Sequence, residues 1–482
     1  MELVKLITLR KIKTLQLTAC TILILFFTAF APAFGQDNSP YSRFGIGDIV
    51  PRTNINTRAM GGIAAGYMDP LTINFNNPAS FANFLVDKET KSNKINSGRA
   101  ILDVGLNFEG RSLKDQNFTK RFNATNSLFS YVQIGIPIKP KWGLSFGLRP
   151  VSRISYKIRE RELLKDPNTN MPIDSAETLY NGQGGAYLVS LGTGIALFKK
   201  TVRLKKGEHE GDSIGVTSLS IGLNGGYLFG EKDYSTKRTL FNDTVSYNQA
   251  NYETKTNFGS INFNAGIQYK IPLQKRLSLT LGAFGNWQQK INASQDIIRE
   301  TFVYNPDVGE LRLDSVSDRK DIKGTILWPS SITAGFVLQK NPEYKKSAGW
   351  LLGIDFEKQN WNNYRFYGQM DSVKNSWKLR IGGQLNPIPK RTYFSNVTYR
   401  FGLFFGPDYV KQGNKLNSVG GSVGLGLPIA TNRQAPNQAT VINVAFEYGK
   451  RGNNNNLLSE NTFRISVGLS LSDFWFIKRK YD

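Results

Sequence analysis

The sequence predicts an all-β protein, an antiparallel transmembrane β-barrel of about fourteen strands. Three observations lead to this fold class. The chain begins with an export signal, much of the rest alternates between apolar and small or polar residues, and no apolar run after residue 36 reaches the roughly 18 residues of a membrane helix. An exported chain without helical spans can cross a bilayer only as a closed barrel.

The first 35 residues have the three regions of a secretory signal peptide. A basic start precedes an almost wholly apolar stretch over 15–30, and Ala33-Phe34-Gly35 forms a small-x-small cleavage site. We therefore predict a signal peptide over 1–35. The single cysteine, Cys20, would leave with it.

Alternation with a period of two marks the predicted strands of a barrel over 99–482. It often continues for about ten residues, whereas strands of soluble proteins average about five or six, so a soluble β-sandwich fits less well. In a membrane barrel the apolar face meets lipid and the polar face meets the lumen. The segments lie near 101–111, 126–138, 142–158, 184–198, 214–234, 254–271, 276–293, 324–339, 349–361, 374–386, 394–409, 415–429, 437–450 and 460–475.

The connections between these segments alternate between short and long. Short ones lie near 137–141 and 272–275, and long loops are expected near 159–183, 235–253 and 294–323. Barrels of the Gram-negative outer membrane have short periplasmic turns and long outer loops. We therefore predict an outer-membrane location with both termini in the periplasm.

Many basic residues fall at the predicted short turns, which predicts a basic periplasmic rim. Such a rim could contact anionic lipid headgroups or an acidic protein partner. The residues are Lys139, Lys141, Lys199, Lys200, Lys270, Lys275, Arg276, Lys345, Lys346, Lys390 and Arg391.

Composition excludes several other classes of function. The 482 residues hold 61 Lys and Arg against 37 Asp and Glu, a net charge of +24. Nucleic-acid binding would need basic residues interleaved with aromatics along one groove, so we predict none. One Cys and one His cannot form the usual zinc or haem sites, and His209 lies in a charged connection away from any serine triad. We expect no enzyme activity, no metal and no cofactor.

A motif stretch lies before the first predicted strand. It contains Arg58, Met60, Gly61 and Gly62, then Asp69, and then Asn77, Pro78 and Ala79. This arrangement resembles the FadL/PorV group of outer-membrane proteins. In that family an Arg-x-Met-Gly-Gly stretch, a downstream Asp and an Asn-Pro-Ala motif mark an N-terminal hatch inside a fourteen-stranded barrel. The resemblance implies a hatch or plug over 36–98.

Charged residues also fall on the lumen-facing positions of several predicted strands. Mixed signs would let them pair with one another and with the hatch. The candidates are Arg149, Asp355, Arg380, Arg400, Glu447 and Arg464.

The resemblance implies two functions from different classes. FadL implies passive transport of a hydrophobic small molecule across the outer membrane, and we expect this as the commoner implication of the hatch motif. PorV implies a non-transporting adaptor or subunit of an outer-membrane protein export or barrel-assembly complex. Its protein partners would bind the outer loops or the basic rim. No contiguous apolar lumen face is visible in the sequence, which is evidence against the transporter.

Overall fold

A computed structural model describes residues 39–88, 95–116, 121–204, 213–241, 248–305, 309–413, 415–429, 438–453 and 455–475. The predicted signal peptide, Cys20 and His209 lie outside these residues. Short helices are η1 (Pro40–Arg43), α2 (Ile55–Arg58), η2 (Pro78–Asn83), η3 (Trp361–Asn363) and η4 (Tyr393–Asn396). No helix in the described ranges is long and apolar enough to cross a membrane.

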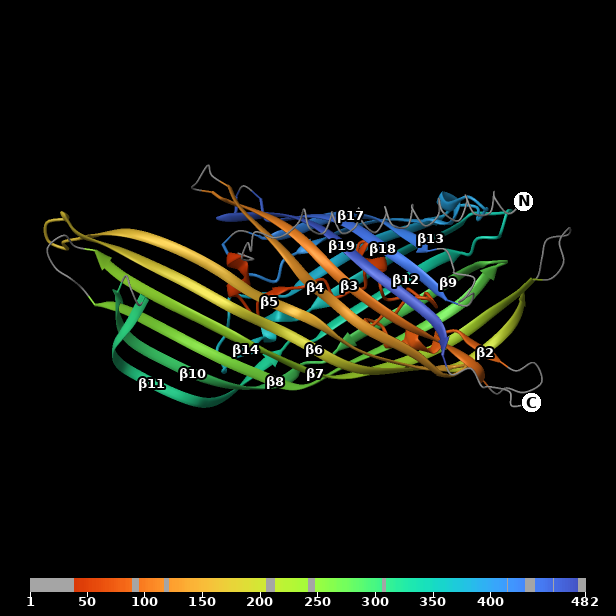
Figure 1. Ribbon diagram of the computed structural model, residues 1–482, viewed down its shortest axis with the longest axis horizontal. Coiled ribbons are helices and arrows are strands. Elements are labelled where there is room, and N and C mark those ends of the chain that lie inside the picture. Colours follow the sequence, from red (N-terminus) through yellow and green to blue (C-terminus); the bar gives the residue numbers. More distant parts are fainter. Residues whose placement is uncertain are drawn as a thin grey trace, which may run out of the picture.

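The strands form one antiparallel sheet that closes on itself (Figure 1). Closure is made by β19, which pairs with β3 from Leu458↔Asp115 to Trp475↔Gly98. Two wall strands are each interrupted once, so β9 continues into β10 and β11 into β12. The described wall therefore has fourteen strands, which confirms the predicted fold class.

The wall strands match the fourteen predicted segments one to one. They are β3 (Ile95–Asp115), β4 (Arg121–Lys139), β5 (Trp142–Lys165), β6 (Pro172–Leu204), β7 (Ser213–Phe241), β8 (Gln249–Gln274), β9 (Leu277–Asn286) with β10 (Gln289–Asn305), β11 (Gly309–Trp328) with β12 (Ser331–Lys340), β13 (Gly349–Gln359), β15 (Ser376–Asn386), β16 (Thr398–Pro407), β17 (Asn417–Ile429), β18 (Ala439–Arg451) and β19 (Leu458–Trp475). The short strands β1 (Asp48–Ile49), β2 (Val86–Lys88) and β14 (Arg365–Phe366) pair with wall strands at their ends or edges.

The two faces of the wall differ as the period of two requires. Along β19, Arg464 and Ser466 are buried on the inner face, while Phe463 and Leu469 stay exposed on the outer face. Aromatic rings stack on the outside, for example Phe356 against Trp377, with ring centroids 6.0 Å apart. An apolar outer band with aromatic residues is what a barrel presents to lipid.

The prediction of long loops at 159–183, 235–253 and 294–323 was wrong. Strands β5, β6, β7, β8, β10 and β11 run on through these regions and form a sheet that projects at one end of the barrel (Figure 1). The extensions are held by cross-strand ion pairs such as Arg161–Glu177 at 2.6 Å and Arg238–Glu162 at 2.5 Å. Because charged residues interrupt the alternation in these stretches, hydrophobic periodicity could not identify them as strands. We call them the projecting sheet.

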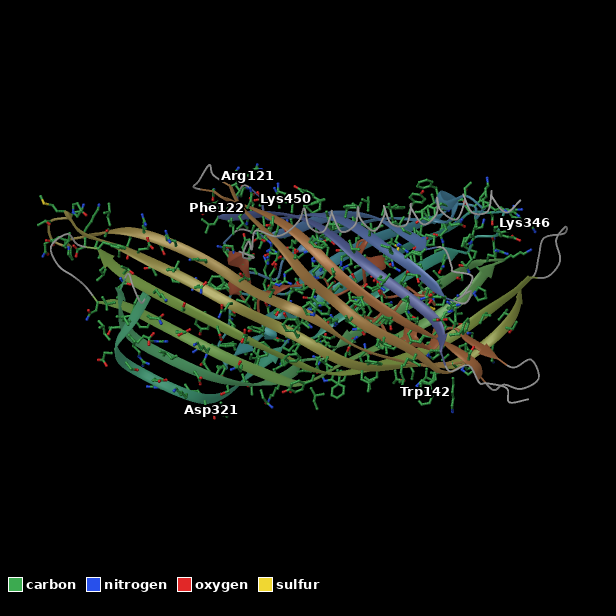
Figure 2. The ribbon with its side chains drawn as sticks, viewed as in Figure 1. Arg121, Phe122, Trp142, Asp321, Lys346 and Lys450 are labelled. Carbon is green, nitrogen blue, oxygen red and sulfur yellow. The ribbon has the colours of Figure 1, made fainter. Side chains whose placement is uncertain are left out.

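The two ends of the barrel are distinct. Figure 2 shows Trp142 and Lys346 toward one end and Arg121 and Asp321 toward the other. The described residues of the predicted basic rim lie at or near the connections of the first end, which also holds the end of β19.

The N-terminal segment, residues 39–88, lies inside the wall (Figure 1). It starts on the side of the projecting sheet, where the Ser39 amide donates to the Ser155 carbonyl at 3.0 Å. It ends at the opposite side, where β2 pairs with β3 at Val86↔Gly98. Strands β4 and β5 pair only as far as Val132↔Leu148. Further along β5, toward the projecting sheet, β1 pairs with β5 in place of β4, at Asp48↔Arg153 and Ile49↔Ser152.

Candidate functional site: the interior of the barrel

The turn at Met60 to Gly62 is pressed against the backbone of the wall. Gly61 and Gly62 have φ angles of +68° and +86°, a conformation that residues with a Cβ atom rarely adopt. A Cβ atom on Gly61 would lie 2.7 Å from the Leu403 carbonyl oxygen, and one on Gly402 would lie 1.9 Å from the Gly61 amide. Glycines on both sides therefore allow this close backbone contact.

Arg58 is almost fully buried and joins the N-terminal segment to three wall strands. Its guanidinium donates to Asn107 Oδ1 at 2.6 Å, to Ser130 Oγ at 3.1 Å and to Ser466 Oγ at 3.2 Å. It also donates to the Thr53 carbonyl at 2.8 Å. Burial lowers the pKa of Arg58 to about 10, so the side chain keeps its charge at neutral pH.

Asn77 is buried and satisfies several backbone groups at once. Its side-chain amide donates to the carbonyls of Ala65 at 2.8 Å and Ile267 at 3.2 Å. Its Oδ1 accepts from the Ala79 amide at 3.2 Å and so caps η2, in which Pro78 occupies the first turn. The motif therefore starts a short helix and attaches it to the wall.

The other motif residues lie apart from this attachment point. Met60 packs in an apolar cluster with Ile63 and Tyr67 of the segment and with Val337 of the wall. Asp69 accepts from the Tyr67 hydroxyl at 3.1 Å and from the backbone amide two residues on, and thus supports its own turn.

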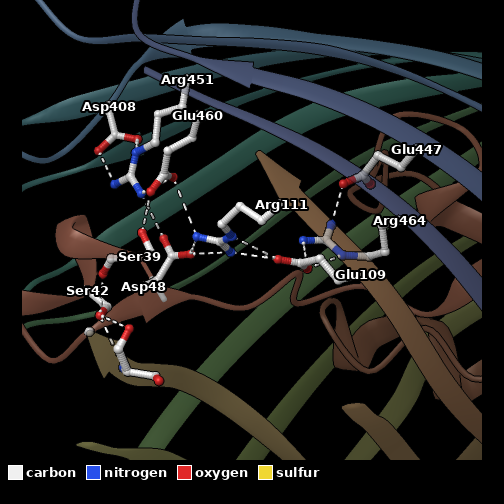
Figure 3. A network of polar contacts seen from close by, with 12 residues as sticks. Ser39, Ser42, Asp48, Glu109, Arg111, Asp408, Glu447, Arg451, Glu460 and Arg464 are labelled. Carbon is white, nitrogen blue, oxygen red and sulfur yellow. Dashed lines mark hydrogen bonds and ion pairs between the residues drawn. The ribbon is translucent and has the colours of Figure 1, made fainter. Parts of the chain in front are cut away.

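Asp48 is the hub of an ion network between the segment and the wall (Figure 3). Its Oδ2 accepts from both terminal nitrogens of Arg111 at 3.0 Å, and its Oδ1 accepts from Arg451 Nη1 at 3.0 Å. Arg451 also pairs with Asp408 at 2.8 Å, and Arg111 lies 3.4 Å from Glu460. The network connects the segment to β3, β16, β18 and β19.

Arg464 and Glu447, two of the predicted lumen charges, extend this network. Arg464 donates to Glu109 at 2.6 Å and pairs with Glu447, and Glu109 in turn accepts from Arg111 at 2.6 Å. These buried charges are therefore compensated by partners, as low dielectric surroundings require.

Asp48 has an acidity set by two opposing effects. Burial acts to raise the pKa of Asp48, but the positive charges of Arg111 and Arg451 outweigh burial and hold the pKa below its usual range. The carboxylate is therefore ionised at neutral pH.

The remaining predicted lumen charges do not join this network. Asp355 Oδ2 accepts from the amides of Ala64 and Ala65 at 2.6 and 2.8 Å, Arg380 pairs with Glu357, and Arg400 donates to Gln384 and Asn443. Arg149 lies over the Phe75 ring at 5.5 Å.

The sequence reading missed several members of the network. Arg451 lies one residue beyond the predicted segment 437–450, and Asp408 lies within the predicted segment 394–409 but directly after the end of β16. Asp48 lies in a segment without periodicity, so only its place beside the motif stretch could have singled it out.

An apolar group, here called the mouth cluster, lies between the projecting sheet, the start of the N-terminal segment and two connections. The Trp361 ring stacks on the Tyr409 ring, with their centroids 4.5 Å apart. It also packs edge to face with the Trp328 ring, with centroids 6.0 Å apart. Its buried members are Tyr41, Ile46, Val151, Ala186, Leu188, Leu228, Phe258, Ile291, Ala293, Ile326, Trp328, Trp361, Tyr364, Val373, Tyr409, Val410 and Leu416.

A chamber of about 310 Å³, lined by both charged and apolar side chains, lies between parts of the mouth cluster and the motif turn. Nine basic and five acidic side chains line it. The basic ones are Arg52, Arg58, Arg111, Arg149, Lys378, Arg380, Lys450, Arg451 and Arg464, and the acidic ones are Asp48, Glu357, Asp408, Glu447 and Glu460. In the part of the chain that the structure describes, no group of three His, Cys, Asp or Glu residues could hold a metal ion.

Two solved structures and one family model are similar to the chain. The chain resembles the solved structure of a Pseudomonas aeruginosa FadL homologue, with 12% identity and a TM-score of 0.49. The match covers 90% of this chain and 100% of the homologue. A Ralstonia pickettii toluene transporter, TbuX, matches over 87% and 98% at 11% identity and a TM-score of 0.44. A comparison with curated protein sequences gives no match.

A family model covers nearly the whole chain. It matches residues 12–206 and 211–482, and so spans the motif stretch and every described wall strand. The chain belongs to the BamG family.

Proposed function

We propose that the protein is an outer-membrane barrel that does not transport small molecules. It acts instead as an adaptor or subunit of an outer-membrane protein export or barrel-assembly complex. The observation that carries this proposal is the content of the lumen, where the N-terminal segment extends from the mouth cluster to η2 and fourteen charged side chains line the space that is left. The segment would serve as a fixed plug, and the end with the basic rim would face the periplasm.

The chamber argues against uptake of a hydrophobic molecule. Sites for such ligands are lined mainly by apolar side chains with few polar groups. Here fourteen charged side chains line a space of about 310 Å³, and an apolar solute would have to displace their hydration. This is the reason to prefer the subunit over the transporter.

The projecting sheet offers the partner a surface that lipid does not cover. Leu163, Ile173 and Phe241 are 68%, 57% and 50% exposed there. Leu163 and Phe241 pair with the same residue of β6, Ser175, from opposite sides, so they lie close together. Exposed apolar patches on a polar sheet mark protein contacts.

The test is the size of the protein in native membranes after gentle solubilisation. We expect a stoichiometric complex on a native gel and its loss in the triple variant Leu163→Ser, Ile173→Ser, Phe241→Ser. Phe394→Ser, an exposed aromatic outside the projecting sheet, is the matched control and should leave the complex intact. A wild-type barrel that migrates alone would refute the subunit role, and saturable uptake of a hydrophobic solute by proteoliposomes would favour the transporter.

A further inference from the structure

Three basic side chains line the chamber and have no carboxylate among the described residues within ion-pair distance. Arg52 comes from the N-terminal segment, Arg149 from β5 and Lys378 from β15. Within the described chain none of the three makes a hydrogen bond or an ion pair, and Arg149 Nη1 is buried without a partner. Arg149 and Lys378 instead lie against the rings of Phe75 and Phe404, at 5.5 and 5.6 Å.

The acids of the chamber are already engaged elsewhere. Glu357 pairs with Arg380, and Glu447 pairs with Arg464. Asp48, Asp408 and Glu460 all contact arginines of the ion network. Each lining carboxylate is therefore paired with an arginine, and none forms an ion pair with the three cations.

Two of the three cations, Arg52 and Arg149, are close enough to repel each other. Arg52 also interacts electrostatically with the Arg380–Glu357 pair, and Lys378 interacts with the same pair and with Asp408 and Glu447. Like charges gathered in a partly buried space repel one another, and water screens them less than at a surface. The chamber has room for about ten water molecules at about 30 Å³ each, so a small anion with its own hydration fits.

We propose that Arg52, Arg149 and Lys378 bind a small oxyanion, a free phosphate or carboxylate, inside the chamber. Guanidinium groups present paired donors that match the oxygens of such anions, and a lysine adds a point charge. Because the three residues belong to three different elements, the anion ties the N-terminal segment to β5 and β15. This inference does not depend on the proposed partner role.

The experiment titrates the purified, full-length mature barrel with inorganic phosphate, sodium acetate or sodium chloride at constant ionic strength. Calorimetry measures binding, and hydrogen exchange measures the protection of amides over 50–62. We expect saturable binding of at least one oxyanion and slower exchange over 50–62 on binding, while chloride has neither effect. Phosphate and acetate distinguish the two sources of the anion.

The variants Arg149→Gln and Arg52→Gln should each weaken binding at least tenfold, since each loses a charge-assisted contact. Arg159→Gln is the matched control, because Arg159 lies on the same strand but points to solvent and pairs with Glu177. A second readout is the order of amide protection over 50–62 in Arg149→Gln and wild type, which should reverse when oxyanion is added. Without oxyanion Arg149→Gln should protect 50–62 better than wild type, because repulsion is relieved, and with saturating oxyanion wild type should protect better.

Three results would overturn the proposal. The first is no saturable binding of phosphate or acetate to the wild type, which would mean that water alone hydrates the cations. The second is equal weakening in Arg159→Gln. The third is exchange over 50–62 that is indifferent to the anion in every variant. Lys378→Gln repeats the test should either arginine variant fail to fold, as judged by its heat-modifiable gel shift.

Discussion

Replacing Asp48 by Asn should loosen the N-terminal segment, including its pairing with β5, without unpairing the wall strands from one another. The carboxylate accepts three guanidinium hydrogen bonds at 3.0 Å, from Arg111 and Arg451. An asparagine keeps one acceptor, loses the charge and turns an amide toward these donors. The wall strands keep their own hydrogen-bonded ladders, so the effect is local.

The size of the effect follows from what remains of the network. Removing one partner of a buried pair costs about 3–5 kcal/mol. The Asp48 side chain is 24% exposed, and Arg111 retains Glu109 at 2.6 Å. We therefore expect a smaller cost for Asp48→Asn, about 2–3 kcal/mol. This corresponds to about 30- to 150-fold more frequent opening of the segment.

The assay is hydrogen exchange of the amides over 39–62 at pH 7, read by mass spectrometry. Asp321→Asn is the matched control, because Asp321 is an exposed aspartate that also pairs with a lysine and a serine. Exchange over 39–62 that changes less than threefold in Asp48→Asn, or equally in the control, would refute the reasoning.

The difference in amide protection between wild type and Asp48→Asn should also depend on pH. The pKa of Asp48 is lowered in the folded protein, so its stabilisation is complete above the ordinary carboxyl pKa of about 4 and disappears as the pH falls through the lowered value. The difference in protection between wild type and Asp48→Asn should be constant from pH 7 to about 4. It should then close at lower pH, after correction for intrinsic exchange rates. A difference that closes between pH 7 and 5 would contradict this assignment.

Three further substitutions test the contacts of the segment, each read by hydrogen exchange and by the heat-modifiable gel shift. Gly61→Ala should destabilise the segment by about 2–4 kcal/mol, because alanine disfavours the left-handed φ and its Cβ atom would clash with the wall. Gly368→Ala is the control: Gly368 has a φ of +78° but nothing within 4 Å, so this change should cost only about 1–2 kcal/mol. Equal costs of the two substitutions would exclude the clash. Asn77→Ala should cost about 2–4 kcal/mol, because buried carbonyls and the first turn of η2 lose their partner, and a cost below about 1 kcal/mol would contradict the cap. Asp355→Leu should cost about 2–4 kcal/mol and Asp355→Asn less than about 1 kcal/mol, because a single oxygen accepts both amides; the reverse order would show that the charge is essential.

The sequence predicted the wall better than its contents, for physical reasons. Lipid on one side and a polar lumen on the other impose strict alternation, so segments such as 460–475 identified their strands and placed Arg464 inward. Beyond the lipid that constraint ends, and the charged extension around Arg161 looked like a loop. Inside the lumen the segment follows no regular period, so the role of Asp48 as a hub depended on contacts with strands more than 60 residues away.

If the N-terminal segment keeps the lumen closed, the purified barrel should not conduct ions when it is inserted in a planar bilayer. We predict no steady conductance step for the wild type, and open-channel events only in variants that loosen the segment, such as Gly61→Ala. Reproducible conductance steps of the wild-type protein would contradict the account.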